Sequence, residues 1–393
     1  QKQGERTGAG VTVLSRYTLR LLTIQQFRRA LGVITACEVL RVANLGDPSR
    51  PIGWRPKDFP YTSQFLWGGV RFSVGMWVGG GVTPNSLIEI KYMQSSGKLR
   101  HIAGALEILQ GLSRGYEGLD PVLGKIARTE DVDAEGDPAQ VLTCPVCRAW
   151  LAIPQEGLPP KQYTMHFVFT GNARPLVSPS ILNMPPRIQV DSTRLVTHTA
   201  PNTQTLSVTF TVIDANVTAR DIDQWWYDTI RSALPATSVP RLLAARPGRP
   251  GYFLCSYTNI QSSSVYNNFE LYCPNPDCTL NQAAWAEQVP ISVAATGTSS
   301  SPQQASLFNT SNGLPSIPGG TWQDVPPFVQ GGSPQLAERI PIPACTVDDQ
   351  VYHRCPSLVV ATVDKFARLA FEPKAGSLFG NVSHYHARWG YYR

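Results

Sequence analysis

The chain has 393 residues, of which 16% are charged, and it contains 32 glycines and 33 prolines. Its length suits two or three domains, and the low charge with many glycines and prolines indicates apolar cores joined by numerous loops. The formal net charge of +6 permits an anionic partner without requiring one. No segment reaches the roughly 18 apolar residues of a membrane span, so we expect no membrane partner.

The start of the sequence has neither an initiator methionine nor a basic and apolar leader. We therefore expect a fragment of a cytoplasmic protein. Eight cysteines include one Cys-x-x-Cys pair. In a chain without an export signal, this spacing favours a metal site over disulfides.

The first elements expected along the chain are a short strand at residues 11–15 and a helix capped by Thr23. Arg16, Thr18 and Arg20 lie between them, where a phosphate could bind. A solvated basic turn explains the same three residues equally well.

A second strand is predicted at residues 70–78, and it runs into three consecutive glycines at positions 79–81. These glycines would let the backbone of a ligand come close, although such a run is often only a turn. Thr83 and Pro84 are expected to start a helix that ends near Met93. Another helix is predicted at residues 99–112, followed by a solvated acidic loop at residues 129–137.

Two cysteine pairs carry the clearest chemical signal. Each pair begins with an apolar segment that leads into Cys-Pro, in Cys144-Pro-Val-Cys147 and in Cys273-Pro-Asn-Pro-Asp-Cys278. Four thiolates satisfy the tetrahedral coordination of Zn²⁺, so we predict a structural zinc site. The alternatives are four unrelated buried thiols or a site that has lost its metal.

Between the two pairs the sequence predicts an α+β module. Strands are expected at residues 164–170, 187–198, 206–213, 252–257 and 269–272. A helix should start at Thr218 with Asp221 in a capping box, and its apolar face includes Trp225 and Trp226. We interpret this tryptophan pair as core rather than as a platform for stacking bases.

Near the C-terminus, residues 358–361 form a short apolar run typical of a strand buried on both faces. Thr362 ends the run, and residues 363–369 begin a helix. Such junctions hold phosphates and nucleic-acid backbones in α/β proteins, but they are also ordinary connections.

Several of these blocks, taken in order, resemble the DrmA family, the helicase-like component of DISARM antiphage systems. The blocks are Val11-Thr-Val-Leu-Ser-Arg-Tyr-Thr-Leu-Arg-Leu-Leu-Thr-Ile-Gln-Gln-Phe-Arg-Arg-Ala30, Phe72-Ser-Val-Gly-Met-Trp-Val-Gly-Gly-Gly-Val-Thr-Pro-Asn85, the two cysteine pairs, residues 347–352, and Ser357-Leu-Val-Val-Ala-Thr-Val-Asp-Lys-Phe-Ala367. The insertion is matched only at its cysteines. The resemblance implies a superfamily 2 ATP-dependent DNA helicase or translocase, with DNA and protein subunits of a defence complex as partners.

The same resemblance implies which residues contact the DNA backbone: Arg16, Tyr17, Thr18, Arg20, Gly80, Gly81, Thr83, Thr362, Asp364 and Lys365. The sequence contains neither Gly-x-x-x-x-Gly-Lys-Ser/Thr nor Asp-Glu-x-His. It therefore looks like an internal fragment between the Walker A and DEAH-type motifs. We expect no catalytic residue and no ATPase activity in this chain alone, with ATP and Mg²⁺ bound only by the parent protein.

The resemblance predicts a partial RecA-like parallel-sheet motor domain that is interrupted by an α+β insertion. Residues 1–140 would form its first part, 141–285 the insertion flanked by cysteines, 286–339 a Ser/Gly/Pro-rich linker, and 340–393 the return to the motor domain. The alternative function is a non-enzymatic, zinc-containing module that binds nucleic acid or protein.

Overall fold

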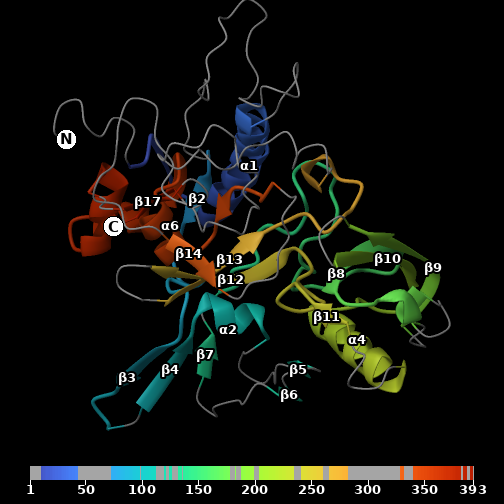
Figure 1. Ribbon diagram of the computed structural model, residues 1–393. Coiled ribbons are helices and arrows are strands. Elements are labelled where there is room, and N and C mark those ends of the chain that lie inside the picture. Colours follow the sequence, from blue (N-terminus) through green and yellow to red (C-terminus); the bar gives the residue numbers. More distant parts are fainter. Residues whose placement is uncertain are drawn as a thin grey trace, which may run out of the picture. The chain divides into compact units, whose positions relative to one another are not determined.

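The chain is a mixed α/β protein, seen in the computed structural model of Figure 1. The structure describes residues 10–42, 72–97, 99–111, 119–120, 124–125, 132–134, 136–177, 182, 187–198, 203–233, 240–259, 265–281, 328–331, 340–381, 384–386 and 390–392. It divides into two compact units. Unit 1 comprises residues 1–87, 255–267 and 282–393, and unit 2 comprises residues 88–254 and 268–281.

A parallel four-stranded sheet forms the centre of unit 1. Its strands are, in order across the sheet, β1 (Val13–Tyr17), β16 (Leu358–Thr362), β2 (Val74–Trp77) and β15 (Ala344–Cys345). All three pairings are parallel, and β16 lies between the two N-terminal strands. The sheet thus combines strands from the N-terminal part of the chain with strands from its C-terminal part.

Helices lie on both sides of this sheet. In Figure 1, α1 (Arg20–Val42) is on one side of β2 and α6 (Asp348–Arg354) is on the other. On the α6 side, Trp77, Val359 and Ala361 pack with α6 and with the 3-10 helix η4 (Pro373–Phe379). Gly75 permits this packing, because a Cβ there would lie 2.9 Å from Cγ of Pro356.

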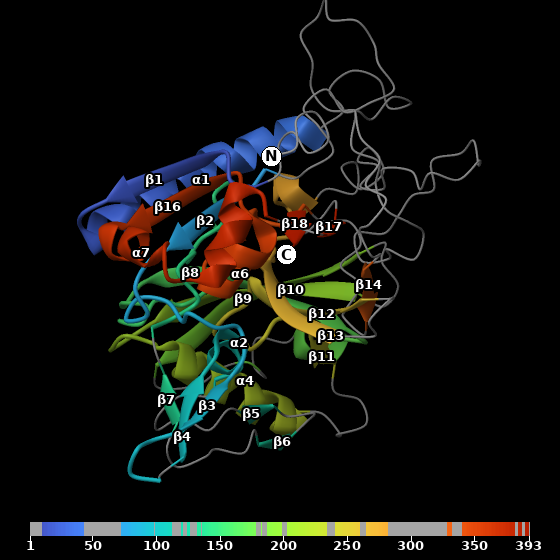
Figure 2. The ribbon, with the colours of Figure 1, turned by 90° about the vertical axis from the view of Figure 1, so that its left-hand side faces the viewer.

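The predicted strand–helix junction at Thr362 is confirmed. β16 is buried except for its half-buried first residue, as its continuous apolar sequence indicates. Helix α7 (Val363–Arg368) follows directly. Figure 2 shows β1, β16 and β2 side by side, with α7 at one end of the strands.

Unit 2 is built on an antiparallel sheet with the strand order β11 (Arg241–Leu242), β8 (Gln162–Thr170), β10 (Thr203–Val212) and β9 (Ile188–Thr197). The aromatic face of the sheet packs against α4 (Ala219–Ala233). Phe167 and Phe169 stack on Trp226 with centroid distances of 4.8 and 5.2 Å. The tryptophan pair is therefore core, as predicted.

The capping box predicted for α4 is also confirmed. The backbone N–H and the hydroxyl of Thr218 both donate to Oδ2 of Asp221, at 2.9 and 2.8 Å. The amide of Asp221 donates in return to the Thr218 hydroxyl at 3.3 Å. These bonds fix the first turn of the helix whose tryptophans fill the core.

Several short elements complete the described chain. They are β3 (Ile90–Met93), β4 (Leu99–Ala103), α2 (Ala105–Leu109), β5 (Leu119–Asp120), β6 (Gly124–Lys125), β7 (Val132–Ala134), η1 (Arg174–Val177), β12 (Tyr252–Asn259), β13 (Val265–Leu271), η3 (Thr279–Asn281), β14 (Phe328–Gly331), β17 (His384–His386) and β18 (Gly390–Tyr392). Of the predicted linker 286–339, only β14 is described. The four-segment division of the chain stays a prediction.

The helix predicted from Thr83 to Met93 is wrong, and the helix predicted at residues 99–112 is confirmed only in part. Residues 80–88 form turns, after which β3 and β4 make an antiparallel hairpin. Gly97, with φ +78°, closes the hairpin through its N–H bond to the carbonyl of Gln94 at 2.9 Å. Only α2, five residues long, is helical in the second predicted segment, because β4 takes up its beginning.

Two smaller predictions are also corrected. Thr23 is not an N-cap, because α1 already begins at Arg20 and the Thr23 hydroxyl donates back to the carbonyl of Leu19. Asp137 does not belong to a solvated loop, since it is 8% exposed and paired with Arg249.

Candidate functional site

The carboxyl ends of β1, β16 and β2 meet at one edge of the unit 1 sheet, which we call the carboxyl edge. The register places Tyr17 opposite Thr362, and Ala361 opposite Trp77. Residues 16–18 and Thr362, far apart in the sequence, are therefore neighbours. The glycine turn at residues 79–81 follows β2 at this same edge, closed by the N–H of Val82 on the carbonyl of Gly79 at 2.9 Å.

The side chains expected to contact DNA differ in their exposure. Arg16, Thr18 and Asp364 are exposed, whereas Tyr17 is half-buried. The guanidinium carbon of Arg16 lies 5.9 Å from the ring centroid of Phe366, a cation–π contact that orients the charge beside α7. Gly81 is exposed and Gly80 half-buried, and the side chain of Arg20 lies outside the described residues.

Two threonines of the predicted set are buried. Thr83 and Thr362 are 0% and 2% exposed, and their hydroxyl oxygens have no hydrogen-bond partner among the described residues. Because burying an unpaired hydroxyl is costly, such groups need a structural or functional explanation.

Lys365 is held inside the protein. It is 5% exposed, forms an ion pair with Asp348, and donates to Oδ1 of Asn85 at 2.9 Å. Burial raises the pKa of Asp348 to about 6, although the Lys365 ammonium opposes this shift. The ammonium of Lys365 is thus satisfied within the chain.

Sequence reasoning missed the polar network around this lysine. Asp349 accepts from the Ser86 hydroxyl at 3.1 Å, from the Leu87 amide at 3.0 Å and from the Lys374 ammonium at 2.8 Å. The network joins the segment after the glycine turn to α6 and η4. Two consecutive aspartates in the first turn of a helix were its signal in the sequence.

Chemically, the carboxyl edge offers an exposed guanidinium, exposed hydroxyl and backbone groups, and a glycine turn. These groups can hold a phosphate without reading a base. The residues named above are brought to one edge by the strand pairing. Their contact with DNA stays a prediction.

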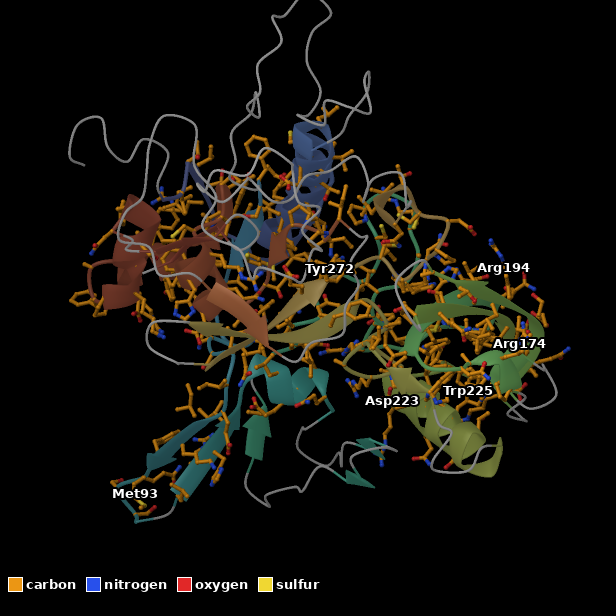
Figure 3. The ribbon with its side chains drawn as sticks, viewed as in Figure 1. Met93, Arg174, Arg194, Asp223, Trp225 and Tyr272 are labelled. Carbon is orange, nitrogen blue, oxygen red and sulfur yellow. The ribbon has the colours of Figure 1, made fainter. Side chains whose placement is uncertain are left out.

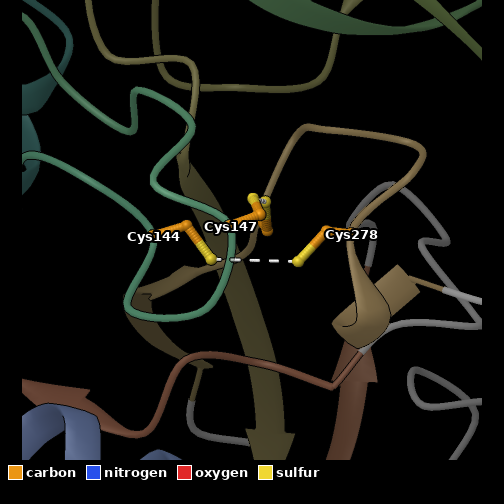
Figure 4. A group of neighbouring side chains, drawn as sticks. Cys144, Cys147 and Cys278 are labelled. Carbon is orange, nitrogen blue, oxygen red and sulfur yellow. Dashed lines mark hydrogen bonds between the residues drawn. The ribbon is translucent and has the colours of Figure 1, made fainter.

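The second candidate site is the cysteine cluster of unit 2. The four sulfur atoms of Cys144, Cys147, Cys273 and Cys278 lie within 4.8 Å of one another. Cys144 and Cys278 are 3.9 Å apart at sulfur, and Cys147 and Cys273 are 3.4 Å apart. Figure 4 shows the thiols of Cys144 and Cys278 pointing toward each other from two separate loops.

Local backbone structure holds both cysteine loops in place. The Cys144 amide donates to the carbonyl of Ala149 at 2.8 Å, and Arg148 adopts a left-handed conformation with φ +65°. In the second loop, the side-chain Nδ2 of Asn281 donates to the carbonyls of Cys273 and Asn275. The turns therefore bring the thiols together through contacts other than those between the sulfurs.

A salt bridge ties the second cysteine loop to the sheet of unit 2. Asp277, between the two cysteines of that loop, accepts two hydrogen bonds from Arg194 of β9. Figure 3 shows Arg194 on this sheet. Both partners are 59% exposed, so the bridge orients the loop more than it stabilises the fold.

The electrostatics of the four thiols favour a bound cation. Hydrogen bonds to Cys144, Cys273 and Cys278 lower the pKa of Cys147, whereas hydrogen bonds to Cys144 and Cys147 raise the pKa of Cys273 and of Cys278. The thiolate of Cys147 is thus favoured, whereas the thiolates of Cys273 and Cys278 are disfavoured. A divalent cation removes this conflict by neutralising the thiolates.

The donor set fits zinc. A tetrahedral site with Zn–S bonds of about 2.3 Å has sulfur–sulfur edges of about 3.8 Å, close to the separations seen here. All four cysteines are free thiols rather than disulfides. Four clustered cysteines can therefore hold a metal ion such as zinc.

Comparison with known proteins finds one partial similarity. No protein-family model matches the chain. Over 50 residues, or 13% of this chain, the sequence is 46% identical to the DISARM protein DrmA of Bacillus paralicheniformis (strain ATCC 9945a / NCIMB 11709 / CD-2). The aligned segment covers 4% of that protein's length. Among the described helices, none is long and apolar enough to cross a membrane. Over the aligned segment, the chain is thus similar to a DISARM protein.

Proposed function

We propose that this chain is part of an ATP-dependent DNA helicase or translocase of an antiphage defence system, with a partial RecA-like sheet that contributes a surface for the DNA backbone. The observation that carries the proposal is the parallel pairing of β1, β16 and β2. It collects residues 16–18, the glycine turn and the β16–α7 junction at one carboxyl edge. The similarity to DISARM protein DrmA supports the system to which we assign it.

The proposed contacts are divided among residues by their exposure. Arg16 and Thr18 offer exposed polar groups, so they would touch phosphates directly. Lys365 would instead position α7 through its bonds to Asp348 and Asn85. ATP and Mg²⁺ would be bound by the parent protein, because these 393 residues contain no Walker A sequence.

The proposal is tested by fluorescence anisotropy with a labelled DNA duplex and a labelled single strand at several salt concentrations. We expect binding that does not depend on the DNA sequence. The logarithm of the observed binding constant should fall linearly with the logarithm of the salt concentration. Arg16→Ala should weaken binding several-fold and reduce the salt slope by about one unit. Arg174→Ala, which removes an exposed charge from unit 2, is the matched control and should bind like the parent chain.

Equal DNA affinity of parent and Arg16→Ala would contradict the assignment of the site. If the chain without substitutions binds zinc but no DNA, this result would favour the alternative function, a non-enzymatic, zinc-containing module. For the motor itself, the readout is DNA-stimulated ATP hydrolysis by a longer protein that includes the Walker A and DEAH-type motifs.

A further inference from the structure

The β3–β4 hairpin of unit 2 exposes more apolar surface than its size explains. Ile88, Ile90, Met93 and Leu99 are 56%, 44%, 67% and 44% exposed, and Tyr92 is 37% exposed. Figure 3 shows Met93 near the turn end of the hairpin. A cluster of exposed large apolar side chains on such a short segment marks an interaction site.

The backbone of β3 is as open as its side chains. β3 is the outer strand of the sheet β3-β4-β7, and its four residues are all exposed. On its outer side, no strand among the described residues pairs with it. An outer strand of this kind offers a row of N–H and C=O groups to another strand.

The segment of residues 88–92, which joins the two residues before β3 to its first three, is complementary to itself in the antiparallel direction. If Ile90 lies on a two-fold axis, it faces Ile90 of a second copy, Glu89 faces Lys91, and Ile88 faces Tyr92. Glu89 and Lys91 already lie on one face of this segment, since Lys91 Nζ lies 3.3 Å from Glu89 Oε2. The other carboxylate oxygen of Glu89 is hydrogen-bonded to Nδ1 of His101 in β4. In this register every apolar residue meets an apolar residue and every charge meets its opposite.

We propose that the outer edge of β3 is a dimerisation surface, on which the β3 strand of a second copy of this chain pairs antiparallel about Ile90. The two three-stranded sheets would become one six-stranded sheet. The inference goes beyond the proposed function and does not rest on it.

A second copy fits this edge better than a nucleic acid does. A phosphate backbone would leave Ile88 and Ile90 facing water, and it would meet the carboxylate of Glu89. A two-fold arrangement uses the acidic, basic and apolar residues together. Because a single strand pairing buries little area, we expect a dimer of modest affinity, on the order of micromolar to tens of micromolar.

The test is sedimentation velocity of the full chain over a range of concentrations. The parent should shift from monomer to dimer as its concentration rises. Ile90→Lys places two ammonium groups opposite each other at the axis and should weaken dimerisation about tenfold or more. Ile213→Lys changes a residue that is 46% exposed outside the hairpin, and it should dimerise like the parent.

Charge exchange makes the test specific to the proposed register. Glu89→Lys and Lys91→Glu each place like charges opposite each other, so each variant alone should be mainly monomeric. Mixed together, the two variants should form a heterodimer, because lysines at both positions of one copy then face glutamates of the other. Circular dichroism of each variant checks that the fold is retained.

A parent chain that stays monomeric at all concentrations would overturn the proposal. So would an Ile90→Lys variant that dimerises like the parent, or two charge variants that fail to associate on mixing although both are folded. If the proposed DNA-binding function fails while the mixed variants associate, the dimer inference stands.

Discussion

At the scale of single residues, the ion pair of Asp137 and Arg249 shows how unit 2 satisfies buried charge. Arg249 is 5% exposed, and it donates to a carboxylate oxygen of Asp137 at 2.6 Å and to the carbonyl of Ile153 at 2.5 Å. Burial lowers the pKa of the Arg249 guanidinium, while the Asp137 carboxylate opposes this shift. The pair is satisfied only as long as both partners are present.

We therefore expect Asp137→Ala to be strongly destabilising. The substitution leaves a buried guanidinium without its counter-ion and should lower the free energy of unfolding by about 3–5 kcal/mol, measured by urea denaturation. Glu156→Ala, at an exposed carboxylate of unit 2, should change it by no more than about 0.5 kcal/mol. Similar losses in the two variants would mean that the ion pair does not carry this stability.

At the scale of elements, Asp348 connects α6 to α7 through Lys365, and its protonation should be visible in the pH dependence of stability. Burial raises the pKa of this carboxyl from 3.8 to about 6. The folded protein thus binds a proton that the unfolded chain releases. The stability that this proton contributes is present below about pH 4 and is lost as the pH rises to about 6.

Asp348→Asn removes this titration. The stability of the parent relative to the variant should therefore fall by up to roughly 3 kcal/mol between pH 4 and pH 6 and then stay constant. Urea denaturation of both proteins at intervals across this range measures the difference. A constant difference from pH 4 to pH 7 would contradict the raised pKa.

The elements that could be predicted are those whose local sequence agrees with their surroundings. β16 and its junction with α7 follow from a buried apolar run, and α4 follows from a capping box and helical spacing. The prediction of a helix after Thr83 was wrong, because β3 instead pairs with β4 in a hairpin that Gly97 closes. The pairing energy comes from another segment, which local patterns do not register.

The candidate sites were predictable to a similar degree. Cysteine spacing indicated the metal cluster, because the ligand type and the turn chemistry are local. The bonds of Lys365 to Asn85 and Asp348, and of Lys374 to Asp349, were not predicted, since each of them joins different elements. Likewise, sequence alone gave no sign that Asp137 is buried beside Arg249, 112 residues away.

At the scale of the whole molecule, each compact unit has a hydrophobic core among its described residues, and the cysteine cluster lies entirely in unit 2. Cys147 and Cys273 are separated by 126 residues, so a bound metal would close a long loop of this unit. Metal binding to ligands from distant segments stabilises the folded state in which they meet. Removing the metal should therefore destabilise unit 2 more than unit 1.

We expect about one zinc ion per chain by mass spectrometry of the metal content, and less in Cys147→Ser. Cys37→Ser, at a half-buried thiol of α1, should keep the metal.

Hydrogen exchange with and without a chelator then shows which parts of the chain the metal stabilises. Amides of the two cysteine loops should lose protection on chelation, whereas those of β1 and β16 should keep theirs. A folded, metal-free protein with unchanged exchange would show that the four thiols need no ion to hold unit 2 together. Equal loss of protection in both units would show instead that they unfold as one cooperative body, because separate cores allow the metal to stabilise one without the other.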